Sequence, residues 1–147
     1  MGYFGALDIS ASGLTAQRLR MDTISQNIAN VSTTHTADGG PYRRKVALFE
    51  ERVAPALYGG YMRTQLKGDN AGLGVRVARI FGDSAPFKKV YEPGHPDADA
   101  DGYVSMPNVD VVTEMVNMIS ASRSYEANVT SLNTTKSMAT KALEIGR

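Results

Sequence analysis

Cysteine is absent from this 147-residue chain. That absence excludes disulfide bonds, thiolate metal sites and thiol catalysis together. The chain also lacks any apolar run of about 18 residues, so its sequence does not predict a membrane span. The amino terminus, MGYFGALDIS, has neither a basic segment nor an apolar core, and we therefore expect no cleavable secretory signal.

A surplus of charge of either sign is missing as well. The net charge is +1, and residues 1–34 and 107–147 each carry equal numbers of basic and acidic side chains. Binding to a phosphate backbone requires a basic excess, so we do not expect nucleic acid as a partner. Neutral ends instead favour close packing among many copies, because unbalanced charge would repel at each contact.

Near the amino terminus, apolar residues recur every seven positions. The series consists of Leu7, Leu14, Met21 and Ile28, with Ile24 at the second position of the seam. A repeat that averages 3.5 residues is typical of coiled-coil-like packing and predicts a helix over residues 7–31. Gly13 weakens this helix, since glycine costs about 1 kcal/mol relative to alanine.

A second helix is predicted over residues 109–145, after Pro107, with Asn108 or Asp110 as its cap. Its seam alternates steps of three and four residues through Met115, Met118, Ser122, Tyr125, Val129, Leu132, Lys136, Ala139 and Leu143. Several threonines make it a poor helix on its own, so it needs packing partners. Periodicity leaves two partners open: the first helix of the same chain, or helices of neighbouring copies.

The middle of the chain has strand patterns. A turn at Gly39-Gly40-Pro41 precedes apolar alternation over residues 43–53 and again over 73–81, and a third short strand is predicted over 87–91. Residues 59–72 read as a connecting loop. The chain is therefore predicted to be α+β, with long N- and C-terminal helices forming a coiled-coil-like core and a small β-rich central region. Its expected parts are a helical arm over 1–34, the central region over 35–106 and a second arm over 107–147.

One motif suggests a cation site. Asp97, Asp99, Asp101 and Gly102 match the first half of a calcium loop. The twelfth position of such a loop requires a bidentate glutamate, and here it is Asn108. An acidic, solvated turn is therefore favoured, although weak divalent binding stays open, and we expect no cofactor.

Histidine is also scarce. The chain has only His35 and His95, and no nucleophile motif accompanies either of them. We therefore predict no catalytic residue and no enzymatic activity.

Motifs at both ends resemble those of bacterial flagellar axial proteins of the rod and hook. Residues 27–33, NIANVST, correspond to the N-x-A-N-x-x-T element of that family, and residues 124–128, SYEAN, resemble its carboxy-terminal arm. Residues 87–97, FKKVYEPGHPD, resemble one type of rod protein within that family. The similarity covers almost the whole chain.

The resemblance implies a structural subunit of the flagellar basal-body rod, the drive shaft that crosses the periplasm. Members assemble helically with copies of themselves and with other rod proteins, after export through the flagellar type III apparatus without a cleavable signal. Their arms tend to be disordered in the free subunit and to fold on assembly. The implied assembly residues are Leu7, Leu14, Met21, Ile24, Asn27, Ile28 and Asn30 on one arm, and Met115, Met118, Tyr125, Val129, Leu132 and Leu143 on the other. Asn27 and Asn30 are expected either to bond across the helices or to end the first arm.

Two other functions fit the same residues. A secreted adaptor built on a helical hairpin would use both seams and stay monomeric or dimeric. A weak calcium-binding interaction module would use the three aspartates of the acidic loop.

Overall fold

The computed structural model describes residues 3–37, 39–53 and 72–145 of the chain. Along the chain, four short strands lie between two long helices. In chain order the elements are α1 (Tyr3–Ala29), β1 (Lys45–Glu51), β2 (Val75–Gly82), β3 (Lys88–Tyr91), β4 (Tyr103–Met106) and α3 (Val111–Ile145). This arrangement confirms the α+β prediction, with a helix at each end and two small antiparallel sheets between them.

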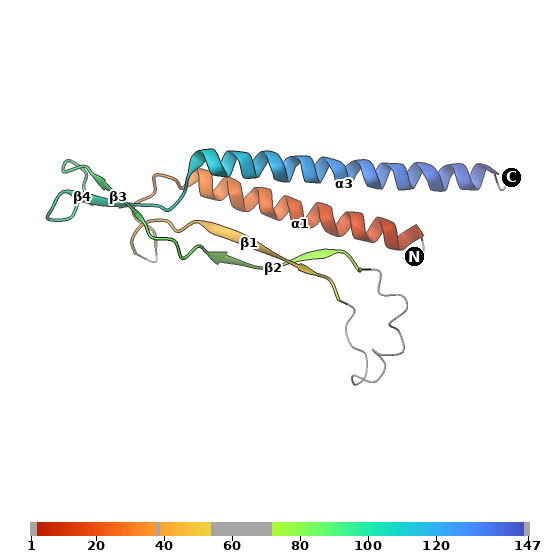
Figure 1. Ribbon diagram of the computed structural model, residues 1–147, viewed down its shortest axis with the longest axis horizontal. Coiled ribbons are helices and arrows are strands. Elements are labelled where there is room, and N and C mark those ends of the chain that lie inside the picture. Colours follow the sequence, from red (N-terminus) through yellow and green to blue (C-terminus); the bar gives the residue numbers. More distant parts are fainter. Residues whose placement is uncertain (1–2, 38, 54–71, 146–147) are drawn as a thin grey trace, which may run out of the picture.

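The two helices lie side by side and antiparallel, so both chain ends lie at the same end of an elongated molecule (Figure 1). Asn27, near the end of α1, bonds to Glu114 in the first turn of α3. Farther along, Gly13 lies against the side chain of Asn128. The helices thus pair within one chain, which is one of the two arrangements that periodicity left open.

A capping interaction fixes the start of α3. The backbone N–H and the hydroxyl of Thr113 both donate to the carboxylate of Asp110. These bonds hold the pKa of Asp110 below its usual value. Asp110 is therefore the cap, and Asn108 has another role: its Oδ1 accepts the N–H of Arg44, which ties α3 to the chain just before β1.

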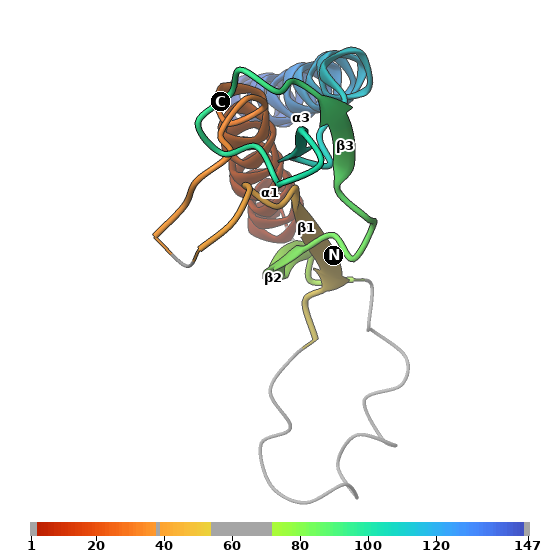
Figure 2. The same cartoon turned by 90° about the vertical axis from the view of Figure 1, so that its left-hand side faces the viewer.

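The first sheet packs on α1. Strands β1 and β2 pair antiparallel from Lys45 opposite Gly82 to Glu51 opposite Val75, and the register shifts between Leu48 and Phe49. Because α1 contacts α3 as well as both strands, it is the middle layer of three (Figure 1). Figure 2, viewed nearly along the helices, shows the same order of layers.

Close packing joins the sheet to α1 at the start of β2. Gly74 has a φ of +95°, and a Cβ there would lie 2.1 Å from Ser12 Oγ. Only glycine tolerates both the backbone conformation and the proximity. The N–H of Val75 donates to the same Ser12 hydroxyl at 3.1 Å, which anchors β2 to the first half of α1.

The second sheet is a hairpin that projects beyond the start of α3 (Figure 1). Strands β3 and β4 pair from Lys88 opposite Met106 to Tyr91 opposite Tyr103, and the two tyrosine rings meet edge to face. Sequence patterns predicted β1, β2 and β3, whereas β4 was missed because its four residues follow the acidic loop and show only one full alternation. The loop predicted over 59–72 lies almost wholly outside the described residues.

The interior contains almost as many polar as apolar side chains. The buried apolar residues are Ala16, Ile24, Tyr42, Val104, Val109 and Ala121, and the buried polar ones are Ser10, Ser12, Thr23, Asn27 and Glu114. Such a core buries little apolar area for its length, so the helix pair is held weakly by hydrophobic contacts. Neither helix, over the residues described, is long and apolar enough to cross a membrane.

Candidate assembly surface

The predicted seam of α1 lies within the molecule. Ile24 and Asn27 are buried, and the remaining predicted residues are half-buried: Leu7, Leu14, Met21, Ile28 and Asn30. Since α1 is the middle layer, its two long sides pack on α3 and on the β1–β2 sheet. The exposed side chains of α1 lie outside the predicted seam and are mostly small or polar, as at Asp8, Thr15 and Ser25.

The predicted seam of α3 divides into two sets. Met118, Tyr125, Val129 and Leu132 are half-buried, whereas Met115 is 55% and Leu143 76% exposed. Facing α1 there is also a line that the predicted seam does not include, through Glu114, Ala121 and Asn128, one residue before three of the predicted positions. Periodicity missed this line because polar and small side chains occupy it, and an apolar pattern cannot reveal them.

Asn27 is the most completely bonded side chain at the junction of the elements. Its Nδ2 donates to the carbonyl of Lys45 at 2.8 Å and to Glu114 Oε2 at 2.9 Å. Its Oδ1 accepts the N–H of Lys45 at 2.8 Å and the hydroxyl of Tyr42 at 3.1 Å. One buried amide thus joins α1, β1 and α3.

Arg44 neutralises the buried carboxylate of Glu114. Its Nε and Nη2 donate to Glu114 Oε1 at 3.0 and 2.7 Å, and its Nη1 donates to Asp83 at 3.2 Å. Burial lowers the pKa of Arg44, but the bonds and charges of the two carboxylates outweigh that effect and raise it. Burial and then the charge of Glu114 raise the pKa of Tyr42. Arg44 therefore stays charged and Tyr42 neutral over the physiological range.

Sequence reasoning found Asn27 but missed its partners Glu114, Arg44 and Tyr42. A usable signal was present, because Glu114 is the lone charged residue between Asp110 and Arg123 in an otherwise uncharged stretch. Such an isolated charge among apolar residues is normally paired.

Asn30 has the other role expected for the motif. Its Nδ2 donates to the carbonyl of Gln26 at 2.8 Å, and its Oδ1 accepts the hydroxyl of Thr33 at 3.2 Å. Helix α1 ends one residue earlier, at Ala29. Of the two expected roles, bonding across the helices thus falls to Asn27 and closing the first arm to Asn30.

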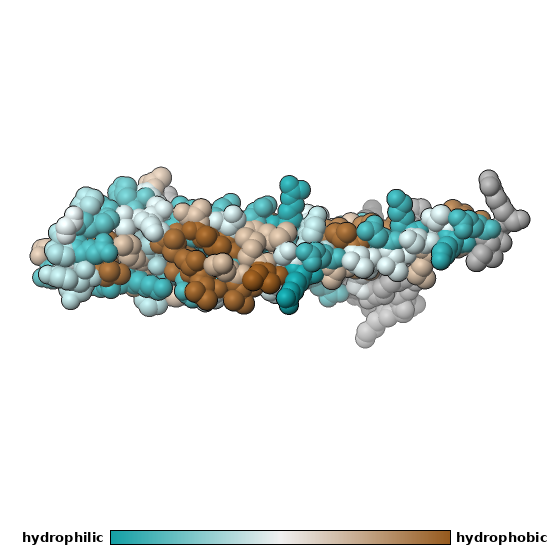
Figure 3. Space-filling model, turned by 90° about the horizontal axis from the view of Figure 1, so that it is seen from above, coloured by the Kyte–Doolittle hydropathy of each residue, from teal (hydrophilic) through white to brown (hydrophobic). Residues whose placement is uncertain are grey.

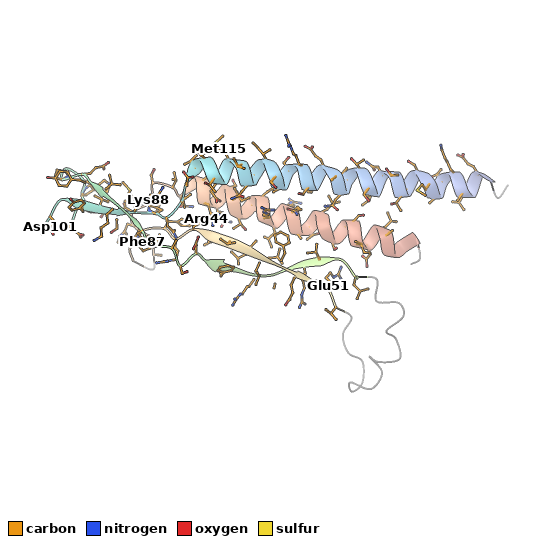
Figure 4. All side chains as sticks on the ribbon, in the orientation of Figure 1. Arg44, Glu51, Phe87, Lys88, Asp101 and Met115 are labelled. Atoms are coloured by element: carbon orange, nitrogen blue, oxygen red, sulfur yellow. The ribbon has the colours of Figure 1, made fainter. Side chains whose placement is uncertain are left out.

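A continuous apolar surface lies on the outer side of α3, away from α1. It consists of Val112, Met115, Val116 and Ile119, which are exposed by 69, 55, 61 and 54%. We call these four residues the α3 patch. Figure 3 shows apolar side chains gathered over the first half of the helix, and Figure 4 shows Met115 pointing outward. An apolar cluster left open on a helix marks a site where another surface packs.

The acidic loop does not gather its carboxylates. Asp97 accepts the hydroxyl of Thr34 at 2.7 Å, and Asp101 lies at the far tip of the β3–β4 hairpin (Figure 4). Among the described residues, no group of three histidines or carboxylates could hold a metal ion. Asp97 instead ties the hairpin to the segment that follows α1.

Comparisons with known proteins agree with this geometry. A family model described as "Flagella basal body rod protein" matches residues 7–34, and one described as "Flagellar basal body rod FlgEFG protein C-terminal" matches residues 100–145. Both matches fall largely on the two paired helices. The class that the fold and the matches define is that of flagellar basal-body rod proteins.

Curated relatives match over the full length. The chain is 52% identical to the flagellar basal-body rod protein FlgC of Borreliella burgdorferi, covering 99% of this chain and 98% of the relative. It is 47% identical to FlgC of Bacillus subtilis and 48% identical to FlgC of Escherichia coli, in each case over 100% of both chains. The chain belongs to the FlgC family and is a structural subunit of the flagellar basal-body rod.

Proposed function

We propose that the chain assembles helically with copies of itself and with other rod proteins into the drive shaft that transmits torque through the periplasm. The observation that carries this proposal is the α3 patch, in which four large apolar side chains are more than half exposed. Exposure of such a surface to water is unfavourable, and covering it with a second apolar surface lowers the free energy. Packing against neighbouring subunits provides that cover.

The proposal assigns different tasks to three parts of the chain. Residues 1–34 and 107–147 are the arms that pack in the shaft, and residues 35–106 form the outer, β-rich part. Within the arms, the residues proposed to support assembly are Leu7, Leu14, Met21, Ile24, Asn27, Ile28, Asn30, Met118, Tyr125, Val129 and Leu132. They act by holding the helix pair in one geometry. Met115 and Leu143 act directly, because both are exposed and apolar.

Export through the flagellar type III apparatus is part of the same proposal. The weakly held helix pair, with its polar interior, supports passage in an unfolded state and folding on assembly. An architectural subunit of this kind uses neither a cofactor nor a catalytic residue. Its site of action is the rod of the basal body, in the periplasmic space.

The test is a charge placed in the α3 patch. Val116→Glu should prevent incorporation into isolated basal bodies and abolish motility, because the carboxylate would be buried without a partner. Ala127→Glu is the matched control: Ala127 is also exposed on α3 but lies outside the patch, so this variant should incorporate normally. Normal incorporation of both variants would refute the role of the α3 patch.

Absence of the wild-type chain from basal bodies would refute the wider proposal. The central region of each variant should remain folded, which the protease resistance of residues 72–106 would verify.

A further inference from the structure

A groove lies beside the end of β2, where the segment that follows α1 approaches the β1–β2 sheet. Its volume is about 880 Å³, within the range of pockets that accept a ligand. Aromatic rings and two cations line it: Tyr42, Phe81, Phe87, Arg43 and Lys45. We call it the basic groove. The paired helices contribute only Gln26 to it, so it is a surface of the central region.

Both cations of the basic groove lie against aromatic rings. The guanidinium carbon of Arg43 is 4.5 Å from the centre of the Phe87 ring, and its Nη1 donates to the backbone carbonyl of Asp83. The ammonium of Lys45 is 5.7 Å from the centre of the Tyr42 ring. Among the described residues, no carboxylate forms an ion pair with either cation. The groove therefore presents positive charge beside aromatic surface, which fits an acidic partner.

The same chain carries a surface of opposite charge at the end of the β3–β4 hairpin. Residues 91–103, which we call the hairpin tip, contain no lysine or arginine. Four exposed carboxylates lie within them, at Glu92, Asp97, Asp99 and Asp101. Tyr91 and Tyr103 add aromatic surface there, with exposures of 63 and 44%. The hairpin tip thus combines negative charge with aromatic rings, as the groove combines positive charge with them.

Backbone hydrogen bonds hold the hairpin tip in one shape. The N–H of Glu92 donates to the carbonyl of Gly102, and the N–H of Gly102 donates to that of Asp99. A loop ordered in advance loses little conformational freedom when it binds. Figure 4 shows Asp101 at the far end of the hairpin and Phe87 at its base, so the hairpin tip does not fill the groove of its own chain.

We propose that the hairpin tip of one copy docks in the basic groove of a neighbouring copy. Carboxylates of the tip then face Arg43 and Lys45, and its tyrosines meet the aromatic rings of the groove. Complementary charge of this kind selects the partner and fixes the register of the contact. This inference rests on the proposed function, and it names a contact outside the paired helices.

The positions of the two surfaces favour contact between copies that lie side by side. Both surfaces lie at the end of the molecule opposite the chain termini (Figure 1). A contact between unlike surfaces leads from each copy to the next and either closes a ring or continues as a helix. In a helical assembly the neighbouring tip is also held close to each groove, which raises its effective concentration there.

Absence of native cysteine allows a cross-linking test of this contact. Ala37→Cys places a thiol in the basic groove and Ala100→Cys places one in the hairpin tip, and both alanines are exposed. The double variant replaces the wild-type chain in cells, and isolated basal bodies are treated with a mild oxidant. Non-reducing electrophoresis should then show disulfide-linked oligomers of the chain. The matched control, Ala100→Cys with Ala127→Cys, should show none, and the single-cysteine variants exclude links between identical positions.

Charge reversal tests the chemistry of the contact. In the double-cysteine chain, Lys45→Glu or Asp101→Lys alone should remove most of the linked product, because like charges then face each other. The two changes together should restore it. Lys45 bonds to Asn27 only through its backbone, so its side chain can be changed without removing those bonds. Arg52→Glu is the matched control, since Arg52 is exposed and does not line the groove.

The outcomes separate this inference from the proposed function. The hairpin contact is wrong, while the rod assignment stands, if basal bodies hold the double-cysteine chain without linked oligomers or if the Ala127 control links equally. The charge variants are also made without cysteines and scored by incorporation into basal bodies. If a single reversal blocks incorporation or linking, recovery in the double reversal supports the contact and lack of recovery overturns it. Absence of the wild-type chain from basal bodies would overturn the proposed function as well.

Discussion

Asn27 and Glu114 are 87 residues apart in sequence, and their side chains bond at 2.9 Å inside the molecule. This bond fixes the register of the two helices at the end where the chain enters and leaves the central region. Asn27 also bonds to both backbone groups of Lys45, so the same side chain sets the position of β1. The first asparagine of the N-x-A-N-x-x-T motif therefore joins α1, β1 and α3.

Loss of the Asn27 amide should destabilise the helix pair. Asn27→Ala removes hydrogen-bond partners from the buried groups of Glu114 and Lys45. We expect it to lower the free energy of unfolding by on the order of 3 kcal/mol. Asn30→Ala is the matched control, since it removes only local bonds to Gln26 and Thr33 and should cost about 1 kcal/mol. Urea unfolding followed by far-UV circular dichroism measures both. Equal losses would contradict the special position of Asn27.

Gly74 should not tolerate a side chain. Gly74→Ala combines a positive φ with a Cβ 2.1 Å from Ser12 Oγ. We expect it to lower the free energy of unfolding by about 1–3 kcal/mol and to release β2 partly from α1. Gly94→Ala is the control, because a Cβ at Gly94 meets nothing within 4 Å. Thermal unfolding of the two variants would show the difference. A Gly74 variant as stable as the Gly94 variant would refute the close approach.

The cap of α3 should be measurable by paired substitutions. Asp110→Ala removes the acceptor for Thr113 and should lower the free energy of unfolding, whereas Asp110→Asn keeps an acceptor and should lower it less. Helix content and urea midpoints of the two variants test this order. If the alanine variant matches the wild type, Asp110 does not cap the helix.

Acidification should lower the stability of the fold, partly through Asp83. The N–H of Ala85 and then the guanidinium of Arg44 lower the pKa of Asp83. A carboxyl whose pKa is lowered on folding stabilises the fold above its unfolded pKa of about 3.9, and that contribution is lost as pH falls through the folded value.

Asp83→Asn should therefore be less stable than the wild type at neutral pH and should lose less stability on acidification. Urea midpoints from pH 7 downward measure the two slopes. Parallel curves for the two proteins would contradict the coupling between Asp83 and Arg44.

Helices and three strands could be predicted from the sequence because each carries its own periodic signal. The line of α3 that faces α1 could not, because Glu114 and Asn128 are polar and their burial depends on partners far away in the sequence. Spacing places Met115 on the seam but leaves its partner open, and in the single chain Met115 is exposed. Spacing alone therefore does not tell a residue that packs within the chain from one left free for a neighbouring copy.

Hydrogen exchange over residues 111–119, 122–131 and 139–145, compared between the free chain and isolated basal bodies, tests whether α3 is covered further on assembly. We expect exchange in the first and last of these segments to slow strongly on assembly, because the α3 patch and the exposed Leu143 in the last turn of α3 become covered and the weakly held pair is stabilised. The middle segment should slow less. Equal exchange of all three segments in the free and assembled chain would mean that α3 makes all its contacts within one subunit, and would refute its role in packing against other subunits.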